Sequence, residues 1–287
     1  MGKPSRHGEG AATERFRLEG RSQSFDPRVD AIRPDLADVA LASRHFAPHY
    51  AKAVARSCVV ARTPVRAKAD ADSEMVSELL FGEGFALLDI TGGWAWGYCL
   101  HDHYVGYVPQ DTLGAYVEPA FRLIAPASVT GANGQPLALP VGALLGDAGS
   151  VPADAIAALD TKADDAVATA EAMFDTPYLW GGRSNEGIDC SGLIQTMLAR
   201  AGIAAPRDSD QQLGGLNGDI DLAAPYQRGD ILYFPDHVGV MIDDKILLHA
   251  TQHYGKVVKE ALADVVARIE SEGHSPAIIG RKRLLAG

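Results

Sequence analysis

The sequence lacks a hydrophobic run long enough to cross a membrane. No stretch of about 18 consecutive apolar residues occurs anywhere in the chain, so no segment is expected to span a bilayer. The chain begins MGKPSRHGEGAATERFRLEG, which is polar throughout and has no apolar core of the kind that a secretory signal needs. Together these two observations predict a cytoplasmic protein.

Cysteine and basic residues are also scarce. Three cysteines, Cys58, Cys99 and Cys190, form an odd and sparse set that offers no disulfide framework, and at least one thiol must be free. The 26 basic residues are outnumbered by 37 acidic ones, which gives a net charge of −11. This charge argues against binding to nucleic acid or to an anionic membrane surface, and it favours a small cationic or zwitterionic partner.

The chain of 287 residues is long enough for two or three units, and its texture changes along its length. A polar tail and a proline-interrupted arm, expected to pack across the other units, cover residues 1–56. Short apolar runs spaced roughly 8 to 12 residues apart within 57–118 predict five strands in a small β-barrel. A weaker β pattern in 119–159 predicts a second, degenerate barrel or a connecting β-ribbon. Helical periodicity followed by strand-like runs in 160–287 predicts an α+β unit.

Helix starts in the last unit place one cysteine at a reactive position. Asp160 or Thr161 is predicted to cap a first helix, which stops before Pro177. A second helix is predicted from about Cys190 to Ala201. A thiol in the first turn of a helix meets unpaired backbone N–H groups and the positive end of the helix dipole, which favours the thiolate.

Two histidines are embedded in apolar, strand-like runs, where a solvated histidine is not expected. His237 and His249 are separated by 249 − 237 = 12 residues, which suits two neighbouring antiparallel strands joined by a turn at Asp243 and Asp244. On one face of such a pair, His237 could take the proton of Cys190 while His249 orients the ring. The backbone N–H of Cys190 would then contribute to an oxyanion site.

The residue types alone leave other interpretations open. A lone cysteine that opens an apolar helix is more often a packed hydrophobe than a nucleophile, and a histidine between strands is more often a hydrogen-bonded core residue. A Cys/His/His metal site is the weakest alternative, because structural zinc normally takes four ligands and neither Cys58 nor Cys99 lies at a suitable spacing. No metal and no cofactor are expected.

Short strings along the chain carry a family resemblance. The last unit contains YLWGG at 178–182, IDCSGL at 188–193, PRDSDQQ at 206–212, RGDILYF at 228–234, DHVGVMI at 236–242 and LLHAT at 247–251. In this order they resemble the NlpC/P60 family of papain-like cysteine peptidases. The strings SEMVSELLFGE, GGWAWGY and DHYVGYV resemble a bacterial SH3 domain, and 119–159 resembles a degenerate second copy. The resemblance implies an α+β fold, with a papain-like catalytic domain at 160–287 preceded by one or two small SH3-like barrels.

The resemblance also implies roles for individual residues. Cys190 resembles the family's nucleophile, His237 its base and His249 its orienting residue. Tyr178 resembles the family tyrosine near the oxyanion site. Substrate-contacting positions of the family are matched by Tyr104, Trp180, Asp189, Ser191, Arg207, Asp208 and Ser209.

Three of these matches carry a specific expectation. Asp189 is predicted to neutralise a cationic N-terminal amine of the substrate. Tyr104 is expected to close the site from the SH3 domain, with Tyr98 and Tyr107 as nearby alternatives. Asp208 also has a simpler interpretation as the N-cap of a short helix.

The combination of domains resembles γ-D-glutamyl-L-diamino acid endopeptidases that recycle cell-wall peptides. The implied partner is a murein tri- or tetrapeptide with a free N-terminal L-alanine, cut between γ-D-glutamate and meso-diaminopimelate or lysine. An N-acetylmuramoyl-L-alanine-type amidase or an acyltransferase is an alternative, since a Cys-His pair supports any acyl transfer. A non-catalytic wall-binding protein is the second alternative. Neither nucleic acid nor membrane is an expected partner, and the oligomeric state stays open.

Overall fold

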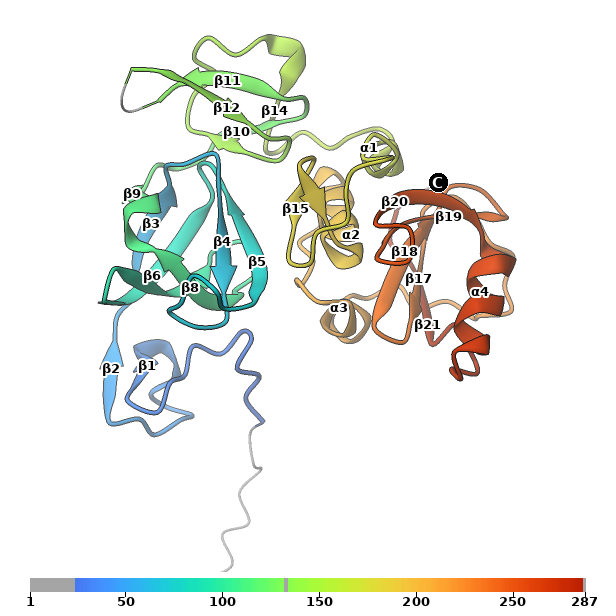
Figure 1. Cartoon of the computed structure of the whole chain (residues 1–287), viewed down its shortest axis with the longest axis horizontal. Coiled ribbons are helices and arrows are strands. Elements are labelled where there is room, and N and C mark those ends of the chain that lie inside the picture. Colours follow the sequence, from blue (N-terminus) through green and yellow to red (C-terminus); the bar gives the residue numbers. More distant parts are fainter. Residues whose placement is uncertain (1–23, 132–133, 286–287) are drawn as a thin grey trace, which may run out of the picture.

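The computed structural model describes residues 24–131 and 134–285. The predicted polar tail, as far as residue 23, lies outside this part of the chain. No helix within the two described ranges combines the length and the hydropathy needed to cross a bilayer. Figure 1 shows four successive parts, which we call the arm (24–53), the first β unit (54–115), the second β unit (119–158) and the C-terminal unit (160–285).

The arm packs against the lower end of the first β unit in Figure 1. Its strands β1 (Leu36–Asp38) and β2 (His49–Ala51) pair in parallel. The guanidinium of Arg33 lies 4.5 Å from the ring centroid of Trp96 and donates to Asp89 at 2.9 Å. A stacked and ion-paired arginine of this kind anchors the arm to the sheet beside it.

The first β unit is a seven-stranded sheet with the order β5-β4-β8-β7-β6-β3-β9. Its core contains Val65, Leu79 and Phe85. The sheet has more strands than the five predicted, in part because the run SCVVAR bends after Cys58. The strands are β3 (Val54–Cys58), β4 (Arg62–Arg66), β5 (Met75–Leu80), β6 (Gly84–Thr91), β7 (Trp94–Cys99), β8 (Val105–Pro109) and β9 (Leu113–Ala115).

The second β unit consists of two small antiparallel sheets around a separate core that contains Leu123, Leu139 and Leu145. In Figure 1 it sits above the first β unit. One sheet has the order β13-β10-β14 and the other pairs β11 with β12. The strands are β10 (Phe121–Leu123), β11 (Ala127–Thr130), β12 (Pro136–Leu139), β13 (Leu144–Leu145) and β14 (Ile156–Ala158).

The C-terminal unit places helices on both faces of a five-stranded antiparallel sheet with the order β20-β19-β18-β17-β21. The helices are α1 (Ala166–Glu171), α2 (Cys190–Arg200), α3 (Ser209–Gly215) and α4 (Leu262–Ser271). The strands are β15 (Arg183–Ser184), β16 (Gly187–Ile188), β17 (Asp230–Phe234), β18 (His237–Met241), β19 (Ile246–Thr251), β20 (Lys256–Ala261) and β21 (Gly280–Arg283).

Alternation along β17 explains why both faces of this sheet are covered. Ile231 and Tyr233 pack in one core with α2, while Leu232 and Phe234 pack in a second core with α4. Side chains of successive strand residues point to opposite faces, so an unbroken apolar run needs a cover on each side. Because α2 covers one face of the sheet, its first residue, Cys190, packs in the core between helix and sheet.

The first helix of this unit starts later than predicted. We expected a cap at Asp160 or Thr161, but α1 begins at Ala166. Asp165 is the N-cap, because its carboxylate accepts from the N–H groups of Val167 at 3.0 Å and of Ala168 at 3.3 Å. A side chain placed directly before the apolar stripe therefore caps the helix, and the upstream candidates do not.

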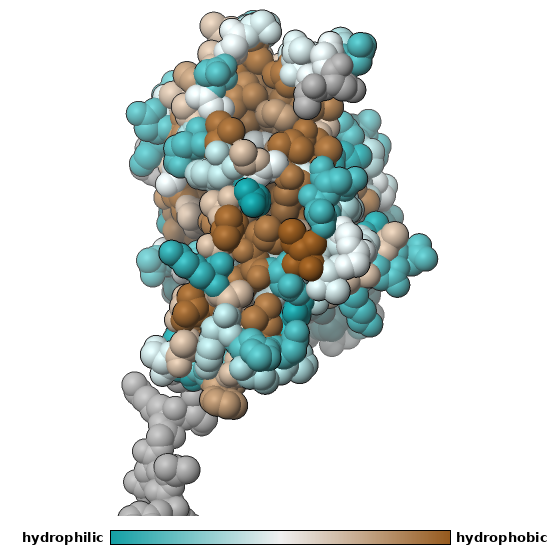
Figure 2. Space-filling view, turned by 90° about the vertical axis from the view of Figure 1, so that its left-hand side faces the viewer, coloured by the Kyte–Doolittle hydropathy of each residue, from teal (hydrophilic) through white to brown (hydrophobic). Residues whose placement is uncertain are grey.

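The side of the molecule that carries β3 and β9 is apolar at its centre. Figure 2 shows hydrophobic side chains gathered over this face, with hydrophilic residues around them. Val54, Val59 and Val117 are large apolar residues that remain exposed. Between the first and second β units, a groove of about 400 Å³ is lined in part by Val129 and Leu144.

A buried ion pair joins the first β unit to the C-terminal unit. Arg183 of β15 is 8% exposed and donates to the two oxygens of Glu83 at 2.8 and 3.2 Å. It also donates to the carbonyl of Glu78 at 2.9 Å and to the side chain of Gln195 on α2 at 2.7 Å. Because charge burial is costly unless every donor is satisfied, this arrangement fixes how the two units meet.

Replacing Glu83 by glutamine is expected to destabilise the protein by about 3–5 kcal/mol, because it leaves the Arg183 charge buried and uncompensated. Chemical denaturation measures the change in the free energy of unfolding. The matched control is Glu186→Gln, since Glu186 pairs with Arg62 at the surface with a side chain 48% exposed. The control should change that free energy by about 0.5 kcal/mol or less. Equal effects of the two substitutions would contradict the role of the buried pair.

Candidate active site

The start of helix α2 is built around the carboxylate of Asp189. Asp189 Oδ1 accepts from the N–H of Gly192 at 2.7 Å, which caps the helix and makes Cys190 its first residue. Position 192 requires glycine, because a Cβ there would lie 2.4 Å from the carbonyl oxygen of Gly182. The local sequence thus fixes Cys190 at the helix N-terminus, as predicted.

The Cys190 sulfur is enclosed by its surroundings. The residue is 7% exposed, and burial raises the pKa of its thiol to about 12, with the charge of Asp189 acting in the same direction. The backbone N–H of Val238 and the charge of Arg207 oppose this rise in pKa without cancelling it. Burial therefore acts against the helix-start effect that we expected to favour the thiolate, and it favours the neutral thiol.

His237 and His249 lie on neighbouring antiparallel strands, as their spacing predicts. Strands β18 and β19 are hydrogen-bonded to each other. His237 Nε2 lies 2.8 Å from His249 Nδ1. His249 is completely buried, and its Nε2 lies 3.1 Å from Glu260 Oε2 on β20. Arg268 of α4 pairs with both Glu260 oxygens, so the side chains form one continuous line.

This line determines which ring nitrogens carry protons. Burial raises the pKa of Glu260, but Arg268 and His249 together lower it below its usual value, so the carboxylate is ionised and can only accept hydrogen bonds. His249 Nε2 must then be the donor, which leaves His249 Nδ1 to accept from His237 Nε2–H. Burial lowers the pKa of His249 from 6.5 to about 4, and burial together with the neighbouring His249 lowers that of His237 to about 3. Both rings are therefore neutral, and His237 Nδ1 has a free lone pair.

Helix α2, which begins at Cys190, packs on strand β18, which begins at His237. The backbone N–H of Val238, the residue after His237, acts directly on the Cys190 sulfur. Across the described residues no hydrogen bond joins the Cys190 sulfur to the His237 ring. A neutral thiol beside a neutral imidazole with a bare Nδ1 is a pair in which the ring can take the thiol proton during a reaction.

A pocket of about 580 Å³ opens beside Cys190 at the junction of the arm, the first β unit and the C-terminal unit. Its lining is rich in carboxylates and contains a single arginine. The lining residues are Arg28, Glu74, Val76, Tyr104, Trp180, Asp189, Cys190, Ser191, Asp208, Ser209, Asp210 and Asp236. Of the residues predicted to contact substrate, all except Arg207 therefore reach this pocket.

Asp189 is committed to structural contacts, which corrects its predicted role. Its Oδ2 accepts from the N–H of Gly181 at 2.8 Å and from Arg207 at 2.6 Å, and its Oδ1 accepts from Arg207 at 3.0 Å. Arg207 is 1% exposed and neutralises the carboxylate. Asp189 therefore has no unpaired charge to offer a substrate amine, although it still lines the pocket.

Asp208 does not match its simpler predicted interpretation as a helix cap, and its predicted role as a substrate contact stays a prediction. It is the N-cap residue of α3 by position, but its side chain makes no capping hydrogen bond. Its Oδ2 instead accepts from the hydroxyl of Tyr104 and from Arg28, each at 3.0 Å. Of the three tyrosines considered, Tyr104 is the one that lines the pocket, and it is 5% exposed. A carboxylate held by its neighbours at one oxygen keeps the other for an incoming cation.

The remaining predicted residues lie around Cys190 in different ways. Trp180 is 55% exposed at the mouth of the pocket. Ser191 accepts from Arg207 at 2.9 Å. Tyr178 lies outside the pocket lining. The pKa of its phenol is raised, mainly by burial and then by the thiolate charge of Cys190, which indicates that the two side chains are close enough to interact.

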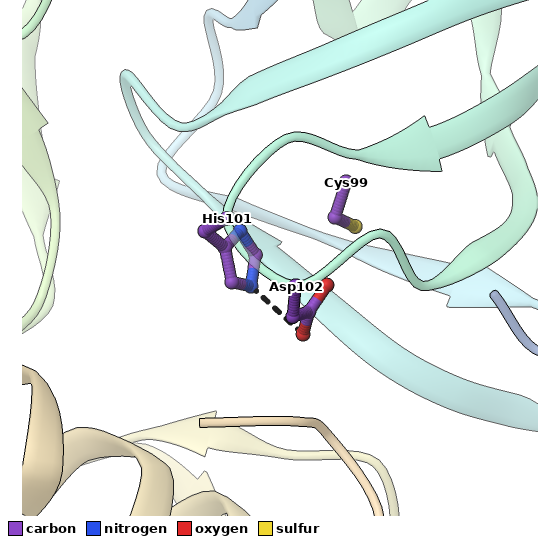
Figure 3. A group of neighbouring side chains, drawn as sticks. All are labelled: Cys99, His101 and Asp102. Carbon is purple, nitrogen blue, oxygen red and sulfur yellow. Dashed lines mark ion pairs between the residues drawn. The ribbon is translucent and has the colours of Figure 1, made fainter. Parts of the chain in front are cut away.

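The side chains most like a metal ligand set lie away from Cys190. Figure 3 shows Cys99, His101 and Asp102, with the His101 ring turned toward Asp102. Their ligand atoms lie within 4.8 Å of one another. However, Asp102 already accepts from the backbone N–H of Tyr104 at 3.0 Å and from Gln195 at 2.9 Å, and burial raises the pKa of Cys99 well above its usual value.

Three candidate ligands with a committed carboxylate and a protonated thiol do not fit a structural zinc site. Asp102 instead links two elements beside the pocket. Gln195 follows Cys190 on α2, and Asp102 ties it to the loop that presents Tyr104. The Cys190 helix and the pocket tyrosine are thereby held at a fixed separation.

Several residues of the site were not predicted from the sequence. Glu260 lies in the mixed string KVVKEA, where nothing local distinguishes it from the neighbouring charged residues. Its function depends on the pairing of β19 with β20, which places it near His249. Arg28 and Glu74 reach the pocket from other units, and Asp236 directly precedes His237, which was the one available local signal.

Comparison with known proteins bears out the fold. Residues 175–272 match the profile of the NlpC/P60 family, and residues 65–113 match that of the bacterial dipeptidyl-peptidase Sh3 domain. An NlpC/P60 family protein from Bacillus cereus superposes with a TM-score of 0.68 at 18% identity, covering 81% of this chain and all of its own. An NlpC/P60 endopeptidase from Photobacterium damselae superposes at 0.54 and 13% identity, covering 80% and 71%. The predicted fold class, a papain-like α+β domain behind an SH3-like unit, is confirmed.

Curated relatives match part of the chain. Dipeptidyl-peptidase 6 of Lysinibacillus sphaericus is 36% identical over 88 residues, which is 31% of this chain and 32% of the relative. The gamma-D-glutamyl-L-lysine dipeptidyl-peptidase of Bacillus cereus is 34% identical over 96 residues, 31% of this chain and 28% of the relative. The chain thus spans about a third of the length of these relatives in the matched region.

The hydrogen-bonded line predicts the protonation of both histidines. Imidazole ¹⁵N NMR should find His237 and His249 neutral with the proton on Nε2 near neutral pH, with the titration of His249 centred at about pH 4. Because both folded-state pKa values lie below 6.5, the unfolded chain binds more protons between pH 6.5 and 4. The free energy of unfolding should therefore decrease as the pH falls through this window.

Glu260→Gln is the comparison variant for that measurement, because an amide can donate as well as accept. It should produce a second tautomer in which His237 carries its proton on Nδ1. A titration midpoint near 6.5 for either histidine, or an Nδ1–H on His237 in the parent protein, would contradict the line.

Proposed function

Because the chain carries an NlpC/P60 domain behind a bacterial SH3 domain, we propose that it is a cysteine peptidase acting on murein peptides with a free N-terminal L-alanine. The bond cut is that between γ-D-glutamate and the diamino acid, either meso-diaminopimelate or lysine. One observation carries the proposal. Cys190 lines an acidic pocket together with Tyr104, Asp208 and Arg28, and the helix that Cys190 begins packs on the two strands that carry the hydrogen-bonded pair His237 and His249.

The reaction follows from the protonation of the site. His237 Nδ1 takes the thiol proton as the Cys190 sulfur attacks the carbonyl carbon, and His249 holds the ring in the required tautomer. The backbone N–H of Cys190 stabilises the oxyanion with a neighbouring donor. His237 then gives its proton to the departing amine, and water hydrolyses the thioester. Starting from two neutral partners, the site forms its ion pair only when substrate is present.

The group of Tyr104, Asp208 and Arg28 supports recognition of a free amine. We expected Asp189 to meet the amine, but its charge is taken by Arg207, so Asp208 is the better partner. The Asp208 side chain is 25% exposed and is held by Tyr104 and Arg28 at Oδ2. A buried carboxylate left without its cation, or a blocked amine pressed against it, loses binding energy. Short unblocked peptides are therefore favoured over peptides linked to sugar.

The alternative of an amidase that cleaves a muramoyl amide requires an open groove for the sugar. Tyr104 and Arg28 line the pocket beside Cys190, and their side chains, both hydrogen-bonded to Asp208, would have to be displaced to make room there for a sugar. The gamma-D-glutamyl-L-lysine dipeptidyl-peptidase of Bacillus cereus, which matches this chain in part, is named for the peptide chemistry proposed here. Both points favour the peptidase.

The proposal predicts cleavage of L-Ala-γ-D-Glu-meso-diaminopimelate, or of its lysine counterpart, with release of L-Ala-γ-D-Glu detected by mass spectrometry. The N-acetylated peptide should be cleaved with about a hundredfold lower kcat/KM, because it has no ammonium group to pair with Asp208 Oδ1 and it adds bulk beside that carboxylate. Cys190→Ala should abolish turnover while its thermal unfolding midpoint stays close to that of the parent. Equal cleavage of the free and acetylated peptides would contradict recognition of the free amine. Turnover by Cys190→Ala would show that Cys190 is not the nucleophile.

A further inference from the structure

The arm places one cation among the carboxylates of the pocket. Among residues 24–131 and 134–285, Arg28 is the only lysine or arginine that lines it, and its side chain is 36% exposed. Nη1 donates to Asp208 at 3.0 Å and to Asp210 at 2.8 Å, and Nη2 donates to Asp210 at 2.8 Å. The second Nη2 hydrogen bond, at 2.8 Å, and those of Nε go to Asp26 of the arm itself.

These contacts use all five N–H donors of the guanidinium. Arg28 therefore has no donor left to bind a carboxylate of the substrate without breaking an existing contact. It faces three carboxylates and orients them, as a planar fork does and a point charge does not. A direct role in holding an anionic substrate group is thus disfavoured by the geometry.

Arg28 also contacts strand β8, which begins directly after Tyr104. The carbonyl of Arg28 accepts from the backbone N–H of Val105 at 2.7 Å, directly after Tyr104. Gln211 of α3 donates to Asp26 at 3.0 Å. The turn at 26–30 thereby bridges the first β unit and the C-terminal unit at the point where Tyr104 meets Asp208.

We propose that Arg28 is a positioning residue for substrate specificity, which makes the arm the third component of the amine site. Arg28 holds Asp208 Oδ2 together with Tyr104, so that Asp208 Oδ1 is presented to the ammonium group of the substrate. This inference rests on the proposed function. It goes further, because it assigns specificity for a free amine to a segment outside both the matched regions.

The charges around Asp208 explain what loss of Arg28 would do. Burial raises the pKa of Asp208, while Arg207, Tyr104 and Arg28 act to lower it. Asp210 on α3 and the other acidic lining residues, Glu74, Asp189 and Asp236, add negative charge on the remaining sides, although Asp189 is neutralised by Arg207. Without Arg28, the pKa of Asp208 rises further, so the ionised carboxylate that pairs with an ammonium persists over a narrower pH range.

The test uses the full chain and the free-amine tripeptide. Arg28→Gln should raise KM about tenfold with a much smaller change in kcat, and the pH below which KM increases should move upward. Arg28→Lys keeps the charge and should restore the pH profile while KM stays above that of the parent, because a lysine lacks the fork. The matched control is Arg44→Gln, an exposed arginine of the same arm outside the pocket lining, which should behave as the parent.

The outcomes separate this inference from the proposed function. If Arg28→Gln matches Arg44→Gln in both KM and pH profile, or if kcat falls at unchanged KM, the positioning role is overturned. If the parent cleaves no peptide, the proposed function fails, and calorimetry with L-Ala-γ-D-Glu on the Cys190→Ala background decides Arg28 separately. There, about tenfold weaker binding in the Arg28→Gln variant supports the role, and equal or absent binding overturns it.

Discussion

The buried ion pair between Arg207 and Asp189 is the contact on which the rest of the site depends. Arg207 is 1% exposed, and it reaches both oxygens of Asp189, the hydroxyl of Ser77 at 3.2 Å and that of Ser191 at 2.9 Å. One charge thus joins the cap of the Cys190 helix to the first β unit. Such a pair is tolerated in the interior because every donor has a partner. The Arg207–Asp189 pair therefore fixes the positions of the residues next to it in sequence, Cys190 and Asp208.

The pocket is composite, because three parts of the chain contribute to its lining. The C-terminal unit supplies the sulfur and the histidine line, the first β unit supplies Tyr104, and the arm supplies Arg28. Two further contacts keep these pieces in register, from Gln195 to Asp102 and from Arg183 to Glu83. The shape of the pocket therefore depends on the contacts between units as much as on the residues of the C-terminal unit.

The parts of the site that are contiguous in sequence were predictable, and the parts assembled across units were not. Cys190, His237 and His249 could be placed because a helix cap, a strand spacing and short motifs are local signals. Glu260 could not be found without the register of β19 and β20, and Arg28 lies some 180 residues from its partner Asp208. The predicted amine partner Asp189 was misjudged for the same reason, since nothing in its neighbourhood shows that Arg207 returns to neutralise it.

The most direct measurement of this account is a crystal structure of the Cys190→Ala variant with L-Ala-γ-D-Glu bound. The account predicts that the ammonium nitrogen lies within about 3.2 Å of Asp208 Oδ1, with Tyr104 beside it and Arg28 still on Oδ2. The carboxyl end of the dipeptide should point to position 190 and the Nδ1 atom of His237. An ammonium group placed against Asp189, or left in solvent with Arg28 turned away from Asp208, would contradict it.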